Sequence, residues 1–125
     1  MSLEENKIKE ELFQKGLNSF NSSNFYDAHE YWEDLWSDYR LTDAKFIQAL
    51  IQLSVGYFHI SNLNRNGAIG LFNKCIPKLE EYSPEYRNID ISNILECVQT
   101  SLNYLDKNDD LSQFDWKIVP ILMNK

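Results

Sequence analysis

The stretch FYDAHEYWEDLW, residues 25–36, decides the fold because its apolar residues recur at helical spacing. On a helix, five of its side chains fall in one stripe about 100° wide. These are Phe25, His29, Trp32, Glu33 and Trp36. A helix with such a stripe must bury it against other helices. The stripe also carries a histidine and a glutamate, which an apolar face does not need for packing.

The same helical spacing extends outward along nearly the whole chain, and no segment alternates as a strand would. Polar breaks separate the apolar segments at residues 21–24, 40–43, 62–67 and 82–90. We therefore expect helices over about residues 4–21, 25–39, 43–61, 68–82 and 91–105. Asn24 and Asp90 are expected to cap the second and the fifth of these helices.

The first helix and the C-terminal segment complete the expected core. In the first helix, the residues expected to face inward are Ile8, Leu12, Phe13, Leu17 and Phe20. The polar stretch DKNDDLSQ is expected to be a linker, and the apolar stretch FDWKIVPILMNK is expected to dock in extended form. The expected organisation is thus a helical domain over residues 1–107, followed by a linker and docked tail over 108–125.

An internal repeat relates the two halves of the helical part at a spacing of forty residues. The matched pairs are Gly16 with Gly56, Asn24 with Asn64, Ala28 with Ala68 and Trp32 with Phe72. Each set gives a small residue in one helix, a loop asparagine, and a small and a large residue in the next helix. Tetratricopeptide hairpins use a comparable pattern with a shorter period. We predict an all-α, compact five-helix bundle of two helical hairpins and a capping helix.

Composition and charge exclude several classes of protein. The formal net charge is −7 and no cluster of Lys and Arg interrupts it, which disfavours nucleic acid and anionic membrane surfaces as partners. The uncharged run 46–64 contains glutamines and a histidine, so a core helix is expected there and not a membrane span. The N-terminus does not look like a signal peptide. Cys75 and Cys97 stand alone, which indicates a reduced, cytoplasmic setting.

A second polar line runs along the third helix and is expected to face the polar residues of the stretch 25–36. It consists of Gln48, Gln52, Val55 and His59. Counting back from the short turn places Glu33 near Gln48 and His29 near Gln52, within one helical turn, and places His59 near Phe25 or Tyr26.

Three interpretations of these polar groups are open. The first is a buried network in which a glutamine amide donates to Glu33 and accepts from His29. This interpretation is favoured because most buried polar groups in proteins are hydrogen-bonded. The second is a ligand or partner pocket. The third is a divalent metal centre of His29, Glu33 and His59, with Glu30 as a further candidate ligand. HEYWE matches only the first half of the HExxH motif of zinc proteases, and no phosphate loop or nucleophile motif occurs.

Four blocks resemble, in order, the DUF309 family, whose members are small helical proteins of unknown function. The blocks are FNSSNFYDAHEYWEDLW, FIQALIQLSVGYFH, NRNGAIGLF and YSPEYRNIDI, within residues 10–105. The resemblance places the AHExxE block on Ala28, His29, Glu30 and Glu33, with Trp36 after it. It places the glutamines on Gln48 and Gln52, the histidine on His59, and the Asn–Gly–Ala turn on Asn64, Gly67 and Ala68. The chain departs from the family's glycines at Ser23, Ala49, Leu63 and Asn88.

Together these observations favour a binding or scaffolding domain over an enzyme. Its candidate site is the polar cluster of His29, Glu30, Glu33, Trp36, Gln48, Gln52, His59 and Asn64. The expected partner is a protein or a small molecule, without nucleic acid, membrane or cofactor, and a homo-oligomer is compatible with the sequence. The alternative is a metal-dependent, hydrolase-like enzyme that uses His29, Glu30, Glu33 and His59.

Overall fold

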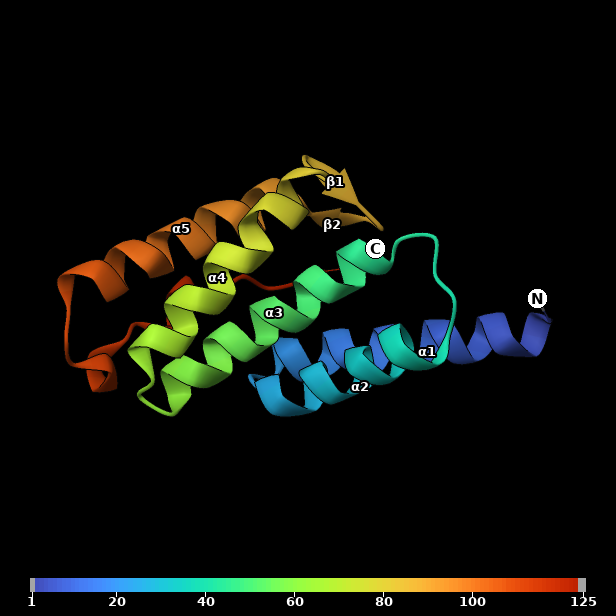
Figure 1. Ribbon diagram of the computed structural model, residues 1–125, viewed down its shortest axis with the longest axis horizontal. Helices are drawn as coiled ribbons and strands as arrows, with labels where there is room; N and C mark the ends of the chain where they lie inside the picture. The colour runs from blue at the N-terminus through green and yellow to red at the C-terminus, as the bar shows by residue number, and fades with distance from the viewer. Residues whose placement is uncertain (1, 124–125) are drawn as a thin grey trace.

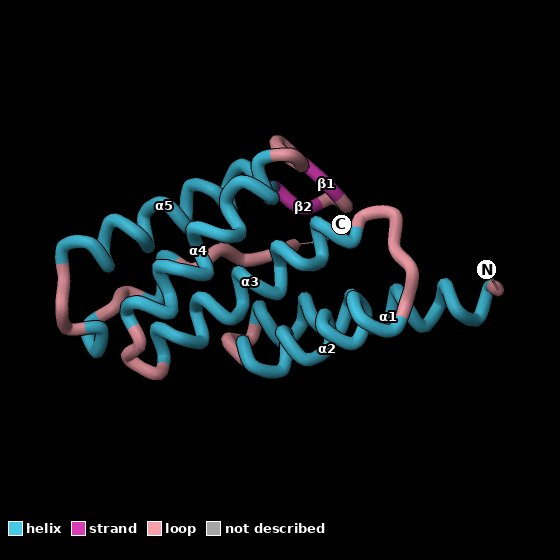
Figure 2. Tube along the Cα trace, in the orientation of Figure 1, coloured by secondary structure: helices cyan, strands magenta, loops and turns pink. Residues whose placement is uncertain are grey.

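The computed structural model describes residues 2–123 and confirms the all-α prediction (Figures 1 and 2). The helices of this part of the chain are α1 (Leu3–Asn21), α2 (Phe25–Asp38), α3 (Ala44–Ser61), α4 (Arg65–Glu80) and α5 (Ile91–Lys107). The shorter elements are the strands β1 (Glu85–Tyr86) and β2 (Ile89–Asp90) and the single 3₁₀ turns η1 (Leu111–Gln113) and η2 (Trp116–Ile118). Helix boundaries fall close to those expected from the sequence. The two-residue strands were not expected.

The helices form two hairpins that share one interface, and α5 covers the second hairpin (Figure 1). Helix α3 lies in the middle and packs against both α2 and α4. It is accordingly the most buried helix, with Phe46, Leu50 and Leu53 fully inaccessible to solvent. The N-terminal part of α1 extends beyond the end of α2 (Figure 1). Ile8 is therefore 37% exposed, so the prediction that it faces the core was wrong.

The hairpins approach closely because each places a glycine opposite an aromatic ring. A Cβ added at Gly56 would lie 2.5 Å from Phe72 Cε1, and one added at Gly16 would overlap the indole of Trp32. Both rings are fully buried. The glycine of the first helix in each hairpin thus makes room for the large residue of the second. These are the residues that the forty-residue repeat paired.

The loops of the two hairpins also share their backbone geometry. Ser23 and Leu63 both adopt left-handed backbone, with φ of 65° and 58°. The next residue donates its N–H at 2.8 Å to the carbonyl of Ser19 in one hairpin and of His59 in the other. Asn88 is left-handed as well, with φ of 62°. At these three positions the family resemblance expects glycine, and the backbone conformation explains why.

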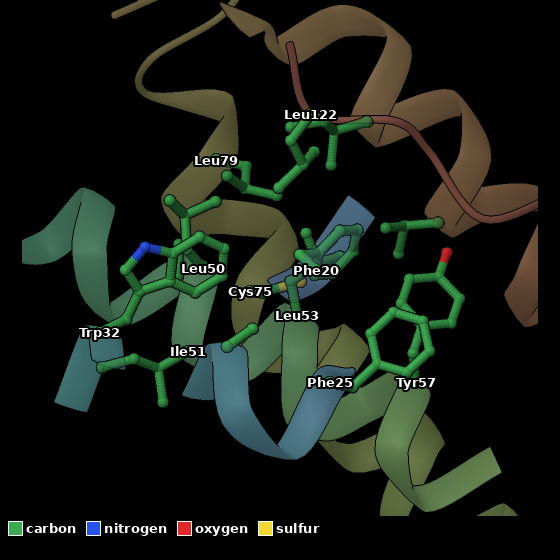
Figure 3. Packing of buried hydrophobic residues seen from close by; sticks show 14 of the residues in the cluster. Phe20, Phe25, Trp32, Leu50, Ile51, Leu53, Tyr57, Cys75, Leu79 and Leu122 are labelled. Carbon is green, nitrogen blue, oxygen red and sulfur yellow. The ribbon is translucent and has the colours of Figure 1, made fainter. Parts of the chain in front are cut away.

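Aromatic side chains fill the core where the hairpins meet (Figure 3). Tyr57 lies at the centre, in ring contact with Phe20, Phe25 and Phe72. Its hydroxyl shares a 2.9 Å hydrogen bond with Ser101 of α5, so the one polar atom of this ring is paired. Burial raises the pKa of Tyr57, and the hydroxyl stays protonated in the folded protein.

The β1–β2 hairpin is fixed to the α2–α3 turn through Asp43. This carboxylate, 7% exposed, accepts hydrogen bonds from the Tyr86 hydroxyl at 3.0 Å and from Arg87 Nε at 2.9 Å. The Arg87 guanidinium in turn lies over the ring of Phe13. Asp43 occupies the N-cap position of α3, but its side chain binds the hairpin and makes no capping bond.

The C-terminal segment docks along the helices in a largely extended conformation up to residue 123 (Figure 1). The side-chain amide of Asn21 donates to the carbonyl of Leu122 at 2.6 Å and accepts from its N–H at 2.7 Å. Leu111, Phe114 and Leu122 are buried. The ring of Trp116 stacks on Phe25 at 5.9 Å. Among residues 2–123, none of the helices has the length and apolar character that crossing a membrane requires.

Candidate functional site

Both histidines of the chain line one small pocket between α2 and α3. The pocket has a volume of about 150 Å³ and an almost wholly apolar lining. Its walls are Phe25, Tyr26 and His29 from α2 and Val55, Phe58 and His59 from α3. The sequence correctly predicted that His59 lies near Phe25 and Tyr26. It placed His29 near Gln52, whereas His29 shares the pocket with residues one turn further along α3.

His59 is held at the pocket by the loop that begins α4. Asn64 Oδ1 accepts the N–H of Gly67 at 2.9 Å, which caps the helix, and Asn64 Nδ2 lies 3.2 Å from His59 Nδ1. A Cβ added at Gly67 would lie 2.6 Å from Asn64 Nδ2 and 2.9 Å from His59 Cγ. Gly67 thus leaves the space in which the other two side chains meet. This gives a physical reason for the Asn–Gly pair of the third sequence block.

His29 is held by its own helix. Its Nδ1 lies 3.2 Å from the backbone carbonyl of Tyr26, one turn earlier. The Tyr26 ring contacts His29 at 5.4 Å between centroids and Phe58 at 5.5 Å, so it bridges α2 and α3 at the rim. Hydrogen bonding to the Glu30 carboxylate raises the pKa of the Tyr26 hydroxyl. Glu30 is itself exposed and lines the rim only through this tyrosine.

The other predicted site residues lie outside the pocket lining. Glu33, Gln48 and Gln52 are half-buried, and Trp36 is 39% exposed. Within residues 2–123, no hydrogen bond joins the Glu33 carboxylate to either glutamine, and Gln52 Oε1 is buried without a partner. The expected hydrogen-bonded network is therefore not formed. The reason is that His29 bonds to its own helix, while the Glu33 carboxylate remains accessible to water.

The alternative metal centre is not supported by the side-chain arrangement. Among residues 2–123, no group of three His, Cys, Asp or Glu side chains lies close enough together to hold a metal ion. His29 and His59 share a pocket, but the remaining walls are aromatic or aliphatic and offer no third ligand of the kind that the hypothesis required.

Larger hollows occur elsewhere but are less enclosed. One of about 520 Å³ runs along α1 and is bounded by charged and polar side chains of that helix alone. Another of about 330 Å³ adjoins the histidine pocket, sharing Phe25, Tyr26 and Phe58 with it, and extends to the loop at Ser23 and Asn24. The histidine pocket is the more enclosed of the two that share these rings.

Sequence reasoning missed the aromatic and aliphatic walls of the pocket as site residues. Phe25 and Val55 were counted only as part of the helical pattern, and Phe58 was not singled out. A signal was present, because each lies one helical turn or less from a histidine: Phe25 four residues before His29, and Val55 four before His59. Both spacings place an apolar side chain beside the imidazole on the same helix face.

The fold is thus an all-α arrangement of two like hairpins, with a histidine-lined hollow between α2 and α3. Residues 13–71 match the family model described as Domain of unknown function (DUF309), which confirms the resemblance over this part of the chain. The matched range contains all six lining residues as well as Asn64 and Gly67, whereas the block at 82–91 lies outside it. No curated protein and no solved structure matches the chain.

Proposed function

We propose that this domain is a binding module that takes a ring-sized group into the pocket between α2 and α3. The observation that carries the proposal is that both histidines of a 125-residue chain line one partly enclosed, otherwise apolar hollow. Ligand sites in proteins commonly combine apolar walls with a few placed polar groups. An apolar cavity of about 150 Å³ is large enough for a benzene-sized group. The occupant is thus a small molecule or one side chain of a partner.

The divergence between the two hairpins supports this proposal. At the positions equivalent to His59 and Gly67, the first hairpin has Ser19 and Asp27. Asn24, the equivalent of Asn64, makes no side-chain capping bond. The first hairpin forms the same loop without a histidine at this position and without the residues that hold it. The repeat fold therefore requires neither His59 nor its contacts with Asn64 and Gly67. The polar arrangement around His59 is therefore an addition to the shared architecture.

Backbone amide NMR of the full chain with toluene and benzamide tests the proposal. A ligand of this size is expected to bind with roughly millimolar Kd. Either probe should shift the resonances of the lining residues, and Val55→Phe should abolish the shifts because the added ring fills the pocket. Leu95→Phe is the control, since it also introduces a phenylalanine ring, at a half-buried position on α5. The proposal is wrong if neither probe shifts the lining residues of the unaltered chain.

A further inference from the structure

We propose that the C-terminal segment, residues 111–123, holds the α1–α2 loop in place and thereby controls ligand binding in the pocket. This rests on the proposed binding function and names the regulation of its site. The segment contacts both ends of the loop. At the end of α1, the side-chain amide of Asn21 makes two hydrogen bonds with the backbone of Leu122. At the start of α2, the ring of Trp116 stacks on Phe25, with 21° between the ring planes.

Phe25 connects the C-terminal segment to the pocket. Its ring lines the hollow between α2 and α3 and also the adjoining hollow that reaches Ser23 and Asn24. Phe25 is only 4% exposed, whereas the Trp116 ring that packs against it is 41% exposed. Trp116 is therefore an outer layer over a residue of the pocket wall. Release of the segment would uncover Phe25 and leave it without this support.

The first turn of α2 needs this support because it lacks a side-chain cap. The first four N–H groups of a helix have no partner within the helix, and a capping side chain usually accepts one of them. Asn64 does so at the start of α4, but Asn24 makes no side-chain capping bond at the start of α2. Phe25 and Tyr26 lie in this first turn and both line the pocket. Fraying of the turn therefore displaces two pocket walls at once.

The C-terminal segment can leave the helices without unfolding any of them. Residues 108–110, which join it to α5, are all exposed. Leu111, Phe114 and Leu122 are buried and anchor the docked segment. Because the docked segment keeps the first turn of α2 in place, a ligand binds this form more tightly than the released form. Such coupling is reciprocal, so ligand binding stabilises docking by the same factor.

The first test asks whether the segment holds the loop, and it needs no ligand. The amide N–H of Asn24 donates to the carbonyl of Ser19 at 2.8 Å, and the equivalent amide of Asn64 donates to that of His59 at the same distance. In the full chain, Trp116→Ala should speed hydrogen exchange of the Asn24 amide about fivefold, which is what an aromatic pair contributes. The Asn64 amide should be unaffected. An unchanged Asn24 amide would overturn the inference, whatever the pocket binds.

Two further variants separate the contacts with the loop from general effects on the segment. Asn21→Ala removes the hydrogen bonds to Leu122 and should also speed exchange of the Asn24 amide. Ile121→Ala is the control, because this side chain belongs to the same segment but is 59% exposed. It should leave the exchange of Asn24 as it is in the unaltered chain. An equal effect of all three variants would mean that the loop senses the segment only through overall stability, and would refute the inference.

The second test measures the coupling to the pocket by amide NMR of the full chain with toluene. Trp116→Ala should raise the Kd for toluene about fivefold, and Ile121→Ala should not. Saturating toluene should in turn slow hydrogen exchange of the Leu122 amide, but not of the Asn93 amide on α5. An unchanged Kd in Trp116→Ala, together with a faster Asn24 amide, refutes control of the pocket and leaves the proposed function standing. No binding of toluene by the unaltered chain refutes both.

Discussion

The close approach of the hairpins can be tested by replacing Gly16 with alanine. The added methyl group would overlap the indole of Trp32, which is fully buried and donates its Nε1–H to the carbonyl of Phe13 at 3.2 Å. Trp32 has no free space into which to retreat. Either the indole turns and loses its hydrogen bond, or α1 and α2 move apart. Both outcomes disturb the centre of the first hairpin.

The magnitude follows from three opposing contributions. Overpacking a filled core costs about 1–3 kcal/mol. The lost hydrogen bond of Trp32 adds about 1 kcal/mol. Replacing glycine by alanine within a helix stabilises that helix by about 1 kcal/mol, which offsets part of this cost. We therefore expect Gly16→Ala to lower the free energy of unfolding by roughly 1–3 kcal/mol. Gly56→Ala should lower it by about 1 kcal/mol less, since Phe72 has no hydrogen bond to lose.

Urea unfolding followed by circular dichroism measures these changes, and the chain provides a matched control. Gly70 also lies inside a helix, α4, but a Cβ added there meets no atom within 4 Å. Gly70→Ala should therefore raise the free energy of unfolding by about 0.5–1 kcal/mol. If Gly16→Ala stabilises the protein as Gly70→Ala does, the glycine–aromatic contact does not set the hairpin spacing and the argument is refuted.

Four further perturbations act on other parts of the fold. Leu63→Gly should stabilise the protein by roughly 1 kcal/mol in urea unfolding, because the residue is left-handed and 62% exposed; no gain would contradict this. Gln52→Met should stabilise it by about 1–3 kcal/mol in the same assay, since it removes a buried oxygen without a partner. Asp43→Asn should destabilise it by about 1–3 kcal/mol by weakening the bonds to the β1–β2 hairpin, and an unchanged unfolding midpoint would speak against that role. Burial raises the pKa of the Cys75 thiol from 9.0 to about 12, so the unfolded chain loses this proton first and stability should fall as pH rises between these values; the fall should be smaller in Cys75→Ala.

The fold could be predicted from the sequence because helical periodicity and loop chemistry are local properties. The residues that start a helix, such as Asn64 and Asp90, bind the backbone three positions further on, although Asn24, which was expected to do the same, makes no side-chain capping bond. The forty-residue repeat added the pairing of helices, since small and large residues must alternate across a close interface. The role of Asp43 was not predictable in this way. Its partners Tyr86 and Arg87 follow it by more than forty residues and lie in a hairpin with no strand signal.

The site was predicted only in part because it depends on the register between two helices. The sequence identified both histidines and placed His59 beside Phe25 and Tyr26. A difference of one turn in the position of α3 along α2 decides whether His29 meets Gln52 or Val55, and helical periodicity does not specify that difference. The choice of partner for each imidazole was equally undetermined. A backbone carbonyl and a side-chain amide can both lie within about one turn of a histidine on a helix. The sequence does not determine which of them the imidazole nitrogen contacts.

The comparison between the hairpins indicates why the pocket lies where it does. The same loop geometry in both hairpins means that the positions of Ser19 and His59 are equivalent, yet only His59 faces a second hairpin across an interface. Substituting a histidine there places an imidazole between two rigid helices without altering the loop. Holding this ring in place then needs a donor at Asn64, which the helix start favours, and a missing side chain at Gly67. A repeat that is structurally complete thus gains a histidine-lined pocket without a change in its loop geometry.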